Sequence, residues 1–584
     1  MSIKTHIGRL LRQKESISYF LLAALTGAMP AICIRLRGRI IDIAGHGSTD
    51  GAGGFFVPLL LFCLLFLLET ACSAGMTRLL ERQKIRRSTQ LDTIRLEKAS
   101  KTAFPVTETQ PFHSLWQKAA EAPALDHQIH RSIGDMLHLS VNLALSLFVL
   151  STMDIWTAAG IVVLLALGIL LSRRMARKTD GFWVKYRENM RQANYFSSLL
   201  MQRDYAAERK LFSFDEEIDR RYQTAYSHAK QENGRMGKDR FQTEALMQAL
   251  FGVYGILLVL LLLRPFLSGK ITLGLFISAF YAAIGLEQSS QRLYAAVYDF
   301  VSAAHQMESF FSFQNLENEP QTEEKMPVHT IRSIEFRDVT FTYPGMDKPV
   351  LKHISFRLEP DHHYALVGEN GCGKSTLVKL LTGLYAPDSG AVLINGMPAH
   401  ELSPADRRRL FCVVFQDFYR YPITIRENVS LCRDVPVDDR TMRDVFDRLA
   451  FHPAAAGRKE GFDSSLMPLF QTGAGLSGGE WQKMAVARCI LSQAPIAILD
   501  EPNAALDPMA EARIYGSYRG LLDQKTSLFI SHRLGSVRLS DEILVLKDGA
   551  LIAKAPHPVL MSECAYYAEL FNTQKGLYDE QPSN

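Results

Sequence analysis

The residues with the clearest chemistry form a glycine-rich run between two apolar segments. The run fits the spacing G-x-x-x-x-G-K-[ST]; Tyr364–Val367 before it is typical of a buried strand, and Leu377–Gly383 after it of a helix ended by glycine. Strand, glycine turn and helix together aim backbone N–H groups at phosphates. We predict a nucleotide site made by Gly368, Glu369, Asn370, Gly371, Cys372, Gly373, Lys374, Ser375 and Thr376.

Charged and hydroxyl side chains near this run predict a metal and a base. Lys374 is expected to reach the β- and γ-phosphates, and the Ser375 hydroxyl to ligate Mg²⁺. A second apolar strand, Pro495–Asp500, ends in Asp500 and is followed directly by Glu501. This arrangement places Asp500 at the metal and Glu501 against an attacking water.

A second phosphate-type loop precedes that strand. Leu476–Glu480 reads Leu-Ser-Gly-Gly-Glu, and a helix is expected from Trp481 onward. Serine and glycines that open a helix make an anion-binding N-terminus. Because the first loop already holds a triphosphate, the second suggests that two copies of the domain close on shared nucleotide.

The segments that must support this site include a membrane half. Six apolar runs lie near the ~20 residues that a bilayer core requires. A signal peptide is an alternative for the first run, but no small-residue cleavage site follows it and three arginines come next. We predict an all-α transmembrane domain at 1–314, with spans at about 17–34, 55–76, 136–153, 155–172, 245–263 and 271–286.

Charge in the links between spans predicts the orientation. The 45–54 loop and the 153–156 corner contain no Lys or Arg, whereas the long loops after the second and fourth spans are rich in both. By the positive-inside rule, the N-terminus, the long loops and the C-terminal half are cytoplasmic. The long loops have helical patterns, and helical extensions of tens of Å fit their lengths at about 1.5 Å per residue. Their tips either touch a soluble domain or are plain solvated helices.

A few ionisable residues lie inside the predicted spans, where they are costly against lipid. Arg35 and Arg39 share one helix face, with Arg37 between them, and Glu69 lies near the end of the second span. A cationic wall for an anionic substrate is one interpretation of the arginines. Pairing with Asp42, or snorkelling to the outer interface, is the other.

Composition excludes several other classes of function. The formal net charge of the chain is +4, so bulk basicity does not indicate nucleic acid as a partner. The eight cysteines form no CxxC or CxxxH grouping, which argues against a disulfide framework and a zinc site.

The second half has the pattern of a soluble α/β domain. Residues 315–330 are polar, acidic and proline-bounded, as in a linker, 331–576 form the predicted nucleotide-binding domain, and 577–584 a tail. Ile334–Tyr343 alternates like a strand. Tyr343 at its end either stacks on a purine or is an ordinary edge-strand tyrosine.

The order of these motifs resembles the ATPase domain of ABC transporters, and with six spans in front the whole chain resembles an exporter-type half-transporter. This order excludes a P-loop kinase. The motifs that carry the resemblance are the glycine loop, Gln416 within Phe415–Val429, Leu476–Glu480, Asp500–Glu501, Asn503–Asp507 and Ile530–Arg533.

The resemblance implies a role for each matched residue. Tyr343 would stack the adenine, Glu501 would be the general base, and His532 would contact the γ-phosphate. Gln416 would contact Mg²⁺ and the attacking water, which makes Ser375, Gln416 and Asp500 the metal set. The contacts to the partner subunit's ATP would be Ser477, Gly478, Gly479 and Glu480, and the D-loop Ala504, Ala505, Leu506 and Asp507.

The resemblance also implies coupling helices at the tips of the two long loops, near Phe112–Gln117 and Phe212–Ile218. Three positions depart from the family pattern. Glu480 stands where Gln is usual, Ala504 where Ser is common, and residues 471–475 lack the glutamate often seen in exporters. None of these departures removes a catalytic group, which favours a homodimer over a heterodimer.

The implied function is ATP-driven export by alternating access, with ATP and Mg²⁺ as cofactors and a second half-transporter subunit as partner. The expected location is a bacterial inner membrane. The run Leu-Ser-Gly-Gly-Glu-Trp-Gln-Lys resembles bacterial peptide exporters, so peptide is the favoured substrate, ahead of lipid or hydrophobic drug. No peptidase domain precedes the first span, so leader-peptide cleavage by this chain is not expected. The alternatives are an exporter-fold importer of a metal–chelate complex and a non-transporting ATP-gated channel or sensor.

Overall fold

The computed structural model describes most of the chain. Outside a few isolated positions, the described residues are 3–46, 51–152, 188–202, 205–269, 271–319, 331–431, 436–452, 461–466, 476–500, 524–530 and 540–579. The chain divides into two compact units. Unit 1 comprises Met1–Thr102 and Thr109–Glu317, and unit 2 comprises Ala103–Glu108 and Asn318–Asn584. The fourth predicted span, 155–172, and the 153–156 corner lie outside the described residues, apart from isolated positions.

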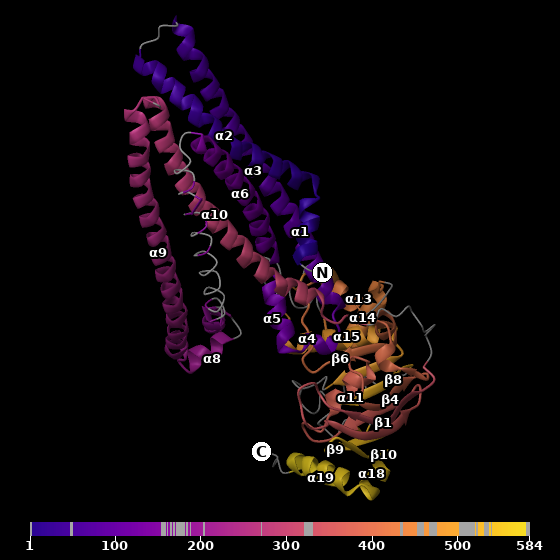
Figure 1. Ribbon diagram of the computed structural model, residues 1–584. Helices are drawn as coiled ribbons and strands as arrows, with labels where there is room; N and C mark the ends of the chain where they lie inside the picture. Colours follow the sequence, from indigo (N-terminus) through magenta and orange to yellow (C-terminus); the bar gives the residue numbers. More distant parts are fainter. Residues whose placement is uncertain are drawn as a thin grey trace. The chain divides into compact units, whose positions relative to one another are not determined.

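The described part of unit 1 is helical, and several of its helices are much longer than a membrane is thick (Figure 1). Three of the described helices, α2, α3 and α6, contain apolar stretches long enough to cross a bilayer. The 51 residues of α3 extend ~76 Å at a rise of ~1.5 Å per residue, so the helix continues well past the bilayer. The fifth predicted span, 245–263, falls within α9. The sixth, 271–286, falls within α10 except for the first two residues of the span. The helices of this unit with described bounds are α1 (Ile3–Leu11), α2 (Lys14–His46), α3 (Gly51–Lys101), α5 (Gln110–Ala119), α6 (Ala122–Ser151), α8 (Ala206–Leu211), α9 (Asp215–Leu267) and α10 (Leu273–Gln314).

A buried carboxylate joins three of these helices. Asp126 on α6 receives hydrogen bonds from Arg87 of α3, with Nη2 at 2.6 Å and Nε at 2.5 Å, and lies 2.7 Å from Nε2 of His6 on α1. A buried charge is tolerated where its partners satisfy it. This cluster therefore fixes the short N-terminal helix against α3 and α6.

A second polar joint connects α2 with the start of α10. Asp42 accepts hydrogen bonds from Gly274 N at 2.7 Å and Thr272 Oγ1 at 2.6 Å. A Cβ at Gly274 would lie 2.1 Å from Gly38 O, so glycine is what allows the two helices to approach here.

The arginines next to this joint have different surroundings. The Arg37 guanidinium stands 5.9 Å from the ring centre of Phe62 and 5.5 Å from that of Tyr281. Arg35 and Arg39 are exposed on unit 1.

Unit 2 contains two sheets in its described part. An antiparallel sheet has the order β2-β1-β4-β5, and a six-stranded sheet has the order β10-β9-β3-β8-β7-β6, in which β9 to β6 are parallel. The strands are β1 (Ile334–Phe341), β2 (Leu351–Leu358), β3 (His363–Val367), β4 (Ser389–Ile394), β5 (Met397–Pro398), β6 (Phe411–Val414), β7 (Ile496–Asp500), β8 (Thr526–Ile530), β9 (Glu542–Lys547) and β10 (Ala550–Ala555).

Helices pack around these sheets, and the predicted strands at 334, 364 and 495 are confirmed to within two residues at each end. The described helices of unit 2 are α4 (Phe104–Thr107), α11 (Lys374–Leu381), α12 (Pro404–Leu410), α13 (Ile425–Ser430), α14 (Asp439–Arg448), α15 (Gly478–Leu491), α18 (His557–Glu563) and α19 (Ala565–Asp579).

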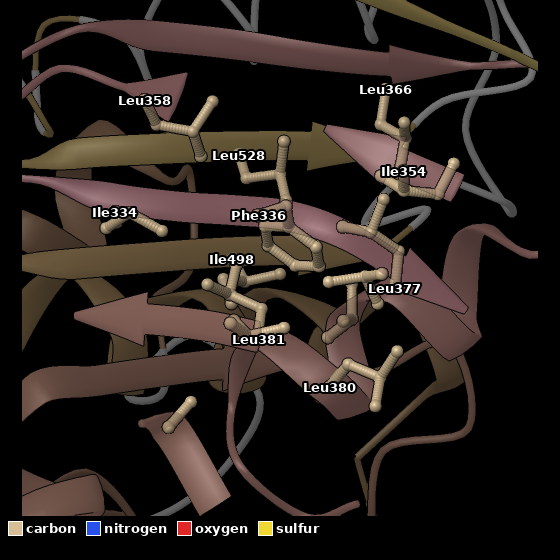
Figure 2. Packing of buried hydrophobic residues seen from close by; sticks show 14 of the residues in the cluster. Ile334, Phe336, Ile354, Leu358, Leu366, Leu377, Leu380, Leu381, Ile498 and Leu528 are labelled. Carbon is tan, nitrogen blue, oxygen red and sulfur yellow. The ribbon is translucent and has the colours of Figure 1, made fainter. Parts of the chain in front are cut away.

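The largest core cluster of unit 2 fills the space between its sheets and α11. Figure 2 shows Phe336 of β1 and Ile354 of β2 packed with Leu377 and Leu381 of α11 and Leu528 of β8. These side chains are almost completely buried, and the apolar surface they remove from water is the main stabilising term. Because α11 follows the glycine loop directly, this core holds that loop in place.

Candidate nucleotide site

The candidate site segments follow the ends of neighbouring parallel strands. The glycine loop begins at Gly368 directly after β3, Gln416 lies two residues after β6, β7 ends at Asp500, and β8 ends at Ile530. Strands β3, β8, β7 and β6 are adjacent and parallel. Their carboxyl ends meet at one edge of the sheet, where ligands of α/β folds bind.

The glycine loop needs glycine at both of its fixed places. A Cβ at Gly368 would lie 2.3 Å from Leu546 O. Gly373 has φ +104° and is the N-cap of α11, a backbone conformation that other residues adopt only under strain. The loop therefore turns tightly and leads straight into the helix, as the sequence predicted.

The lysine of the loop is held inside it. Lys374 is 7% exposed, and its ammonium donates to Gly368 O and Glu369 O, at 2.8 Å each. A fixed ammonium beside backbone N–H groups at a helix N-terminus suits a triphosphate. The geometry fits the predicted role of Lys374.

Oxygen donors suited to Mg²⁺ meet beside this lysine. The Ser375 hydroxyl donates to Asp500 Oδ2 at 3.4 Å, and Asp500 is 5% exposed at the end of β7. A hydroxyl and a carboxylate are hard oxygen ligands of the kind Mg²⁺ prefers. The residues present therefore fit the metal. The third predicted ligand, Gln416, lies after β6 at the same edge with an exposed side chain.

The candidate adenine-stacking residue is tied to the glycine loop. Tyr343 lies two residues after β1, half-buried, and its hydroxyl is 3.1 Å from Thr376 Oγ1. Thr376 ends the predicted phosphate loop, so the ring lies beside the segment expected to hold the triphosphate.

The second anion loop opens α15 with a capping box. Ser477 Oγ accepts from Glu480 N at 3.3 Å, and the Glu480 carboxylate accepts from Ser477 N at 2.7 Å. The helix begins at Gly478, three residues before the predicted start. Glutamate and glutamine both serve at this capping position, which explains physically why Glu480 is accepted there.

A buried polar pair ties the segment after Gln416 to this helix. Arg488 of α15 donates to Asn428 Oδ1 at 2.7 Å, and its guanidinium stands 5.1 Å from the Tyr421 ring centre. The Asn428 amide donates in turn to Thr424 O at 3.0 Å. Sequence reasoning missed this pair, because Asn428 and Arg488 are 60 residues apart.

Several predicted site residues lie outside the described residues. These are Glu501, Ala504, Ala505, Leu506, Asp507 and His532. Their roles stay predictions.

The two segments predicted to be coupling helices lie in unit 1, and their coupling role stays a prediction. Phe112 and Trp116 lie in α5 and pack on Phe313 of α10 within unit 1, with ring centres 5.9 and 5.7 Å apart. The part of the first long loop that belongs to unit 2 is Ala103–Glu108. Of the second predicted tip, Phe212 and Phe214 are exposed on unit 1.

The cysteine inside the glycine loop should react slowly with thiol reagents. Cys372 is 6% exposed, and burial raises the pKa of its thiol although the Lys374 ammonium opposes the shift. Because the pKa is raised, the reactive thiolate is scarce near pH 7 and increases only at more alkaline pH. Alkylation by N-ethylmaleimide, followed by mass spectrometry, should therefore accelerate with pH, and ATP should protect. The half-exposed Cys564 is the comparison; equal rates for the two thiols at pH 7 would contradict this prediction.

A family model described as ABC transporter matches residues 351–504, which include the glycine loop, Gln416, the second anion loop and Asp500. A bacterial Atm1-family ABC exporter with ATP bound has the same fold. It superposes with a TM-score of 0.80 over 97% of this chain and 99% of that chain, at 20% identity.

Curated bacterial relatives are similar over different shares of their length. The nisin transport ATP-binding protein of Lactococcus lactis is 25% identical over 97% of this chain and 94% of its own. The subtilin transport ATP-binding protein of Bacillus subtilis is 29% identical over 67% of this chain and 64% of its own. The ATP-dependent lipid A-core flippase of Vibrio cholerae is 32% identical over 53% of each chain.

Proposed function

We propose that two copies of this chain use ATP to move a substrate out across the membrane. The premise is that the chain belongs to the ABC transporters, as an exporter-type half-transporter with an ATP-hydrolysing domain. The observation that carries the proposal is the shared edge of the parallel sheet. There Lys374 is held inside the glycine loop, and Ser375, the next residue of that loop, donates to Asp500 at the end of β7. The membrane-spanning helices precede this domain in the same chain.

Each nucleotide would be held by two chains. The loop from Gly368 to Thr376 would bind the phosphates, and the start of α15 in the second chain would cover them. This is supported by exposed Gly478 and half-exposed Gly479 at that start, where backbone N–H groups are open to an anion. A homodimer is the simplest form, because no catalytic group is missing from this chain.

Ser375, Asp500 and Gln416 would hold Mg²⁺, which when bound offsets the charge of the phosphates. Lys374 orients the triphosphate from within the loop, and Glu501, directly after Asp500, accepts the proton of the attacking water. Tyr343 positions the adenine by stacking. Closing the two ATPase domains would open the membrane cavity outward, and hydrolysis would reset it.

Peptide is the substrate class we propose first. The support is the similarity to proteins named for transport of subtilin and nisin, one of which aligns over nearly the whole chain. Lipid is the second candidate, because the similarity to lipid A-core flippases has the higher identity, although over about half the chain. The lysine- and arginine-rich loops and the ATPase domain would lie on the cytoplasmic side of a bacterial cell membrane.

Transport into sealed proteoliposomes tests the proposal. Vesicles whose ATPase domains face outward should hydrolyse added ATP and accumulate a nisin- or subtilin-type peptide in the lumen, with hydrolysis stimulated by the same peptide. A lipid substrate would instead stimulate hydrolysis without peptide accumulation and would move labelled lipid between leaflets. ATP hydrolysis that neither substrate stimulates, with no accumulation of either, would overturn both assignments.

A further inference from the structure

Six residues of the first long loop pack within unit 2. Ala103–Glu108 lies between α3 and α5, which belong to unit 1, yet its contacts are with the nucleotide-binding unit. Phe104 is packed against the core of that unit, its ring edge-on to Tyr385 with centres 5.8 Å apart. The helical half of the chain therefore contributes a segment of its own to unit 2.

The last residue of this segment makes two charge-assisted hydrogen bonds. Glu108 Oε1 accepts from Lys379 Nζ at 2.8 Å, and Oε2 accepts from the Tyr385 hydroxyl at 2.5 Å. Burial alone would raise the pKa of the Glu108 carboxyl, but the hydrogen bonds from Lys379 and Tyr385 outweigh it and hold that pKa below its ordinary value. Glu108 is thus an anion at neutral pH, engaged through both oxygens.

Lys379 connects this carboxylate to aromatic rings. It lies on α11, the helix that begins at Lys374, and is 24% exposed at its side chain. Its ammonium stands 5.6 Å from the ring centre of Phe104, 5.5 Å from that of Tyr343 and 5.7 Å from that of Tyr385. Three rings from three different segments thus surround one cation, within the range of cation–π attraction.

The ring of Tyr343 is fixed from several sides by this arrangement. It is edge-on to Tyr385, with centres 5.4 Å apart and planes at 87°, and edge-on to Phe341 at 5.0 Å. Its hydroxyl reaches Thr376. Without the Lys379 charge or the Tyr385 ring, the Tyr343 ring would be held in this orientation by fewer contacts.

We propose that Lys379 and Tyr385 are positioning residues for the ring of Tyr343, and that Glu108 holds both, so that the first long loop controls affinity for the adenine base. The proposal rests on the proposed function, in which Tyr343 stacks adenine. Since coupling is reciprocal, a loop that tightens base binding is itself held more firmly when the base is bound. The affinity for the phosphates, which the glycine loop would bind, should not depend on these residues.

The test separates base from phosphate in the full-length protein. For Glu108→Gln and Lys379→Met, KM for ATP should rise about three- to tenfold, as expected when ring and cation–π interactions of this kind are weakened. The value of kcat should change little. Competitive inhibition by inorganic tripolyphosphate, which carries no base, should be unchanged. Lys379→Arg, which keeps a cation over the rings, should restore most of the affinity for ATP.

Glu319→Gln is the matched control. Glu319 is a partly buried carboxylate of unit 2 that accepts from Arg407 at 3.0 Å. The contacts described for Tyr343, Lys379 and Tyr385 do not include Glu319, so its loss should leave KM for ATP unchanged. The Tyr343→Ala variant, which lacks the ring altogether, should show the largest increase in KM for ATP that loss of stacking can cause.

Different outcomes refute different statements. If Tyr343→Ala leaves KM for ATP unchanged, the stacking role in the proposed function is wrong. If Tyr343→Ala raises KM while Glu108→Gln and Lys379→Met behave like Glu319→Gln, the positioning role is wrong. If tripolyphosphate inhibition weakens in parallel with KM, the variants disturb α11 and the phosphate loop, which also overturns the positioning role.

Discussion

Changing Glu501 to glutamine is expected to lower kcat for ATP hydrolysis roughly 10²- to 10⁴-fold, the usual contribution of a general base. Glutamine has the same shape but cannot accept the proton of the attacking water. Asp500, the residue before it, is buried at the end of β7 beside Ser375, so the position of the metal donors should not change. The affinity for Mg-ATP, measured by calorimetry on the full-length variant, should change less than about threefold, which corresponds to less free energy than one typical hydrogen bond contributes.

The control for this experiment is Glu542→Gln. Glu542 begins β9, at the opposite end of the strands from Asp500, and pairs with Lys554 at 2.9 Å. Its loss removes a carboxylate without touching the site and should leave kcat unchanged. Full turnover by Glu501→Gln would show that another group takes the proton.

Changing Lys374 to methionine should weaken ATP binding roughly 10- to 150-fold, the value of a hydrogen bond to a charged group. The Lys374 ammonium is buried inside the loop and oriented by two carbonyl oxygens. Methionine fills similar space but carries no charge to offset the triphosphate. Calorimetric titration of the full-length protein with Mg-ATP measures the loss.

Lys352→Met controls for the removal of a positive charge, because Lys352 is exposed on β2. Binding to that variant should match the unchanged protein. A Lys374→Met variant that binds ATP as tightly as the Lys352→Met control would mean that the glycine loop does not hold the phosphates.

Local patterns in the sequence predicted much of unit 2. The strand that ends at Val367, the glycine turn and the helix after it follow from steric rules that act within a few residues, and the structure confirms them. The start of α15 was predicted three residues late, because Trp481 opens the apolar pattern whereas the capping box begins the helix at Gly478. Glu501 and His532 lie outside the described residues, so the evidence for them is still the sequence.

Contacts between distant residues could not be predicted in the same way. An amphipathic helix such as α5 reveals an apolar face but not the surface it packs on, so the packing of Phe112 on Phe313 of α10 could not be predicted. Glu108 and Lys379 are 271 residues apart, and neither belongs to a recognisable motif. Their pairing depends on the tertiary structure that brings the two segments together, and sequence periodicity does not predict such contacts.

The capping box at Ser477 restricts which residue can occupy that position. A hydroxyl has two acceptor lone pairs and one hydrogen, and capping Glu480 N uses only an acceptor. The hydrogen is left to donate to an oxyanion of a second molecule while the helix start stays capped. Aspartate would cap equally well but would repel a triphosphate, and alanine would lose both the cap and the donor. Serine at this position would therefore combine a stable helix end with a neutral donor for the phosphate that we propose it contacts.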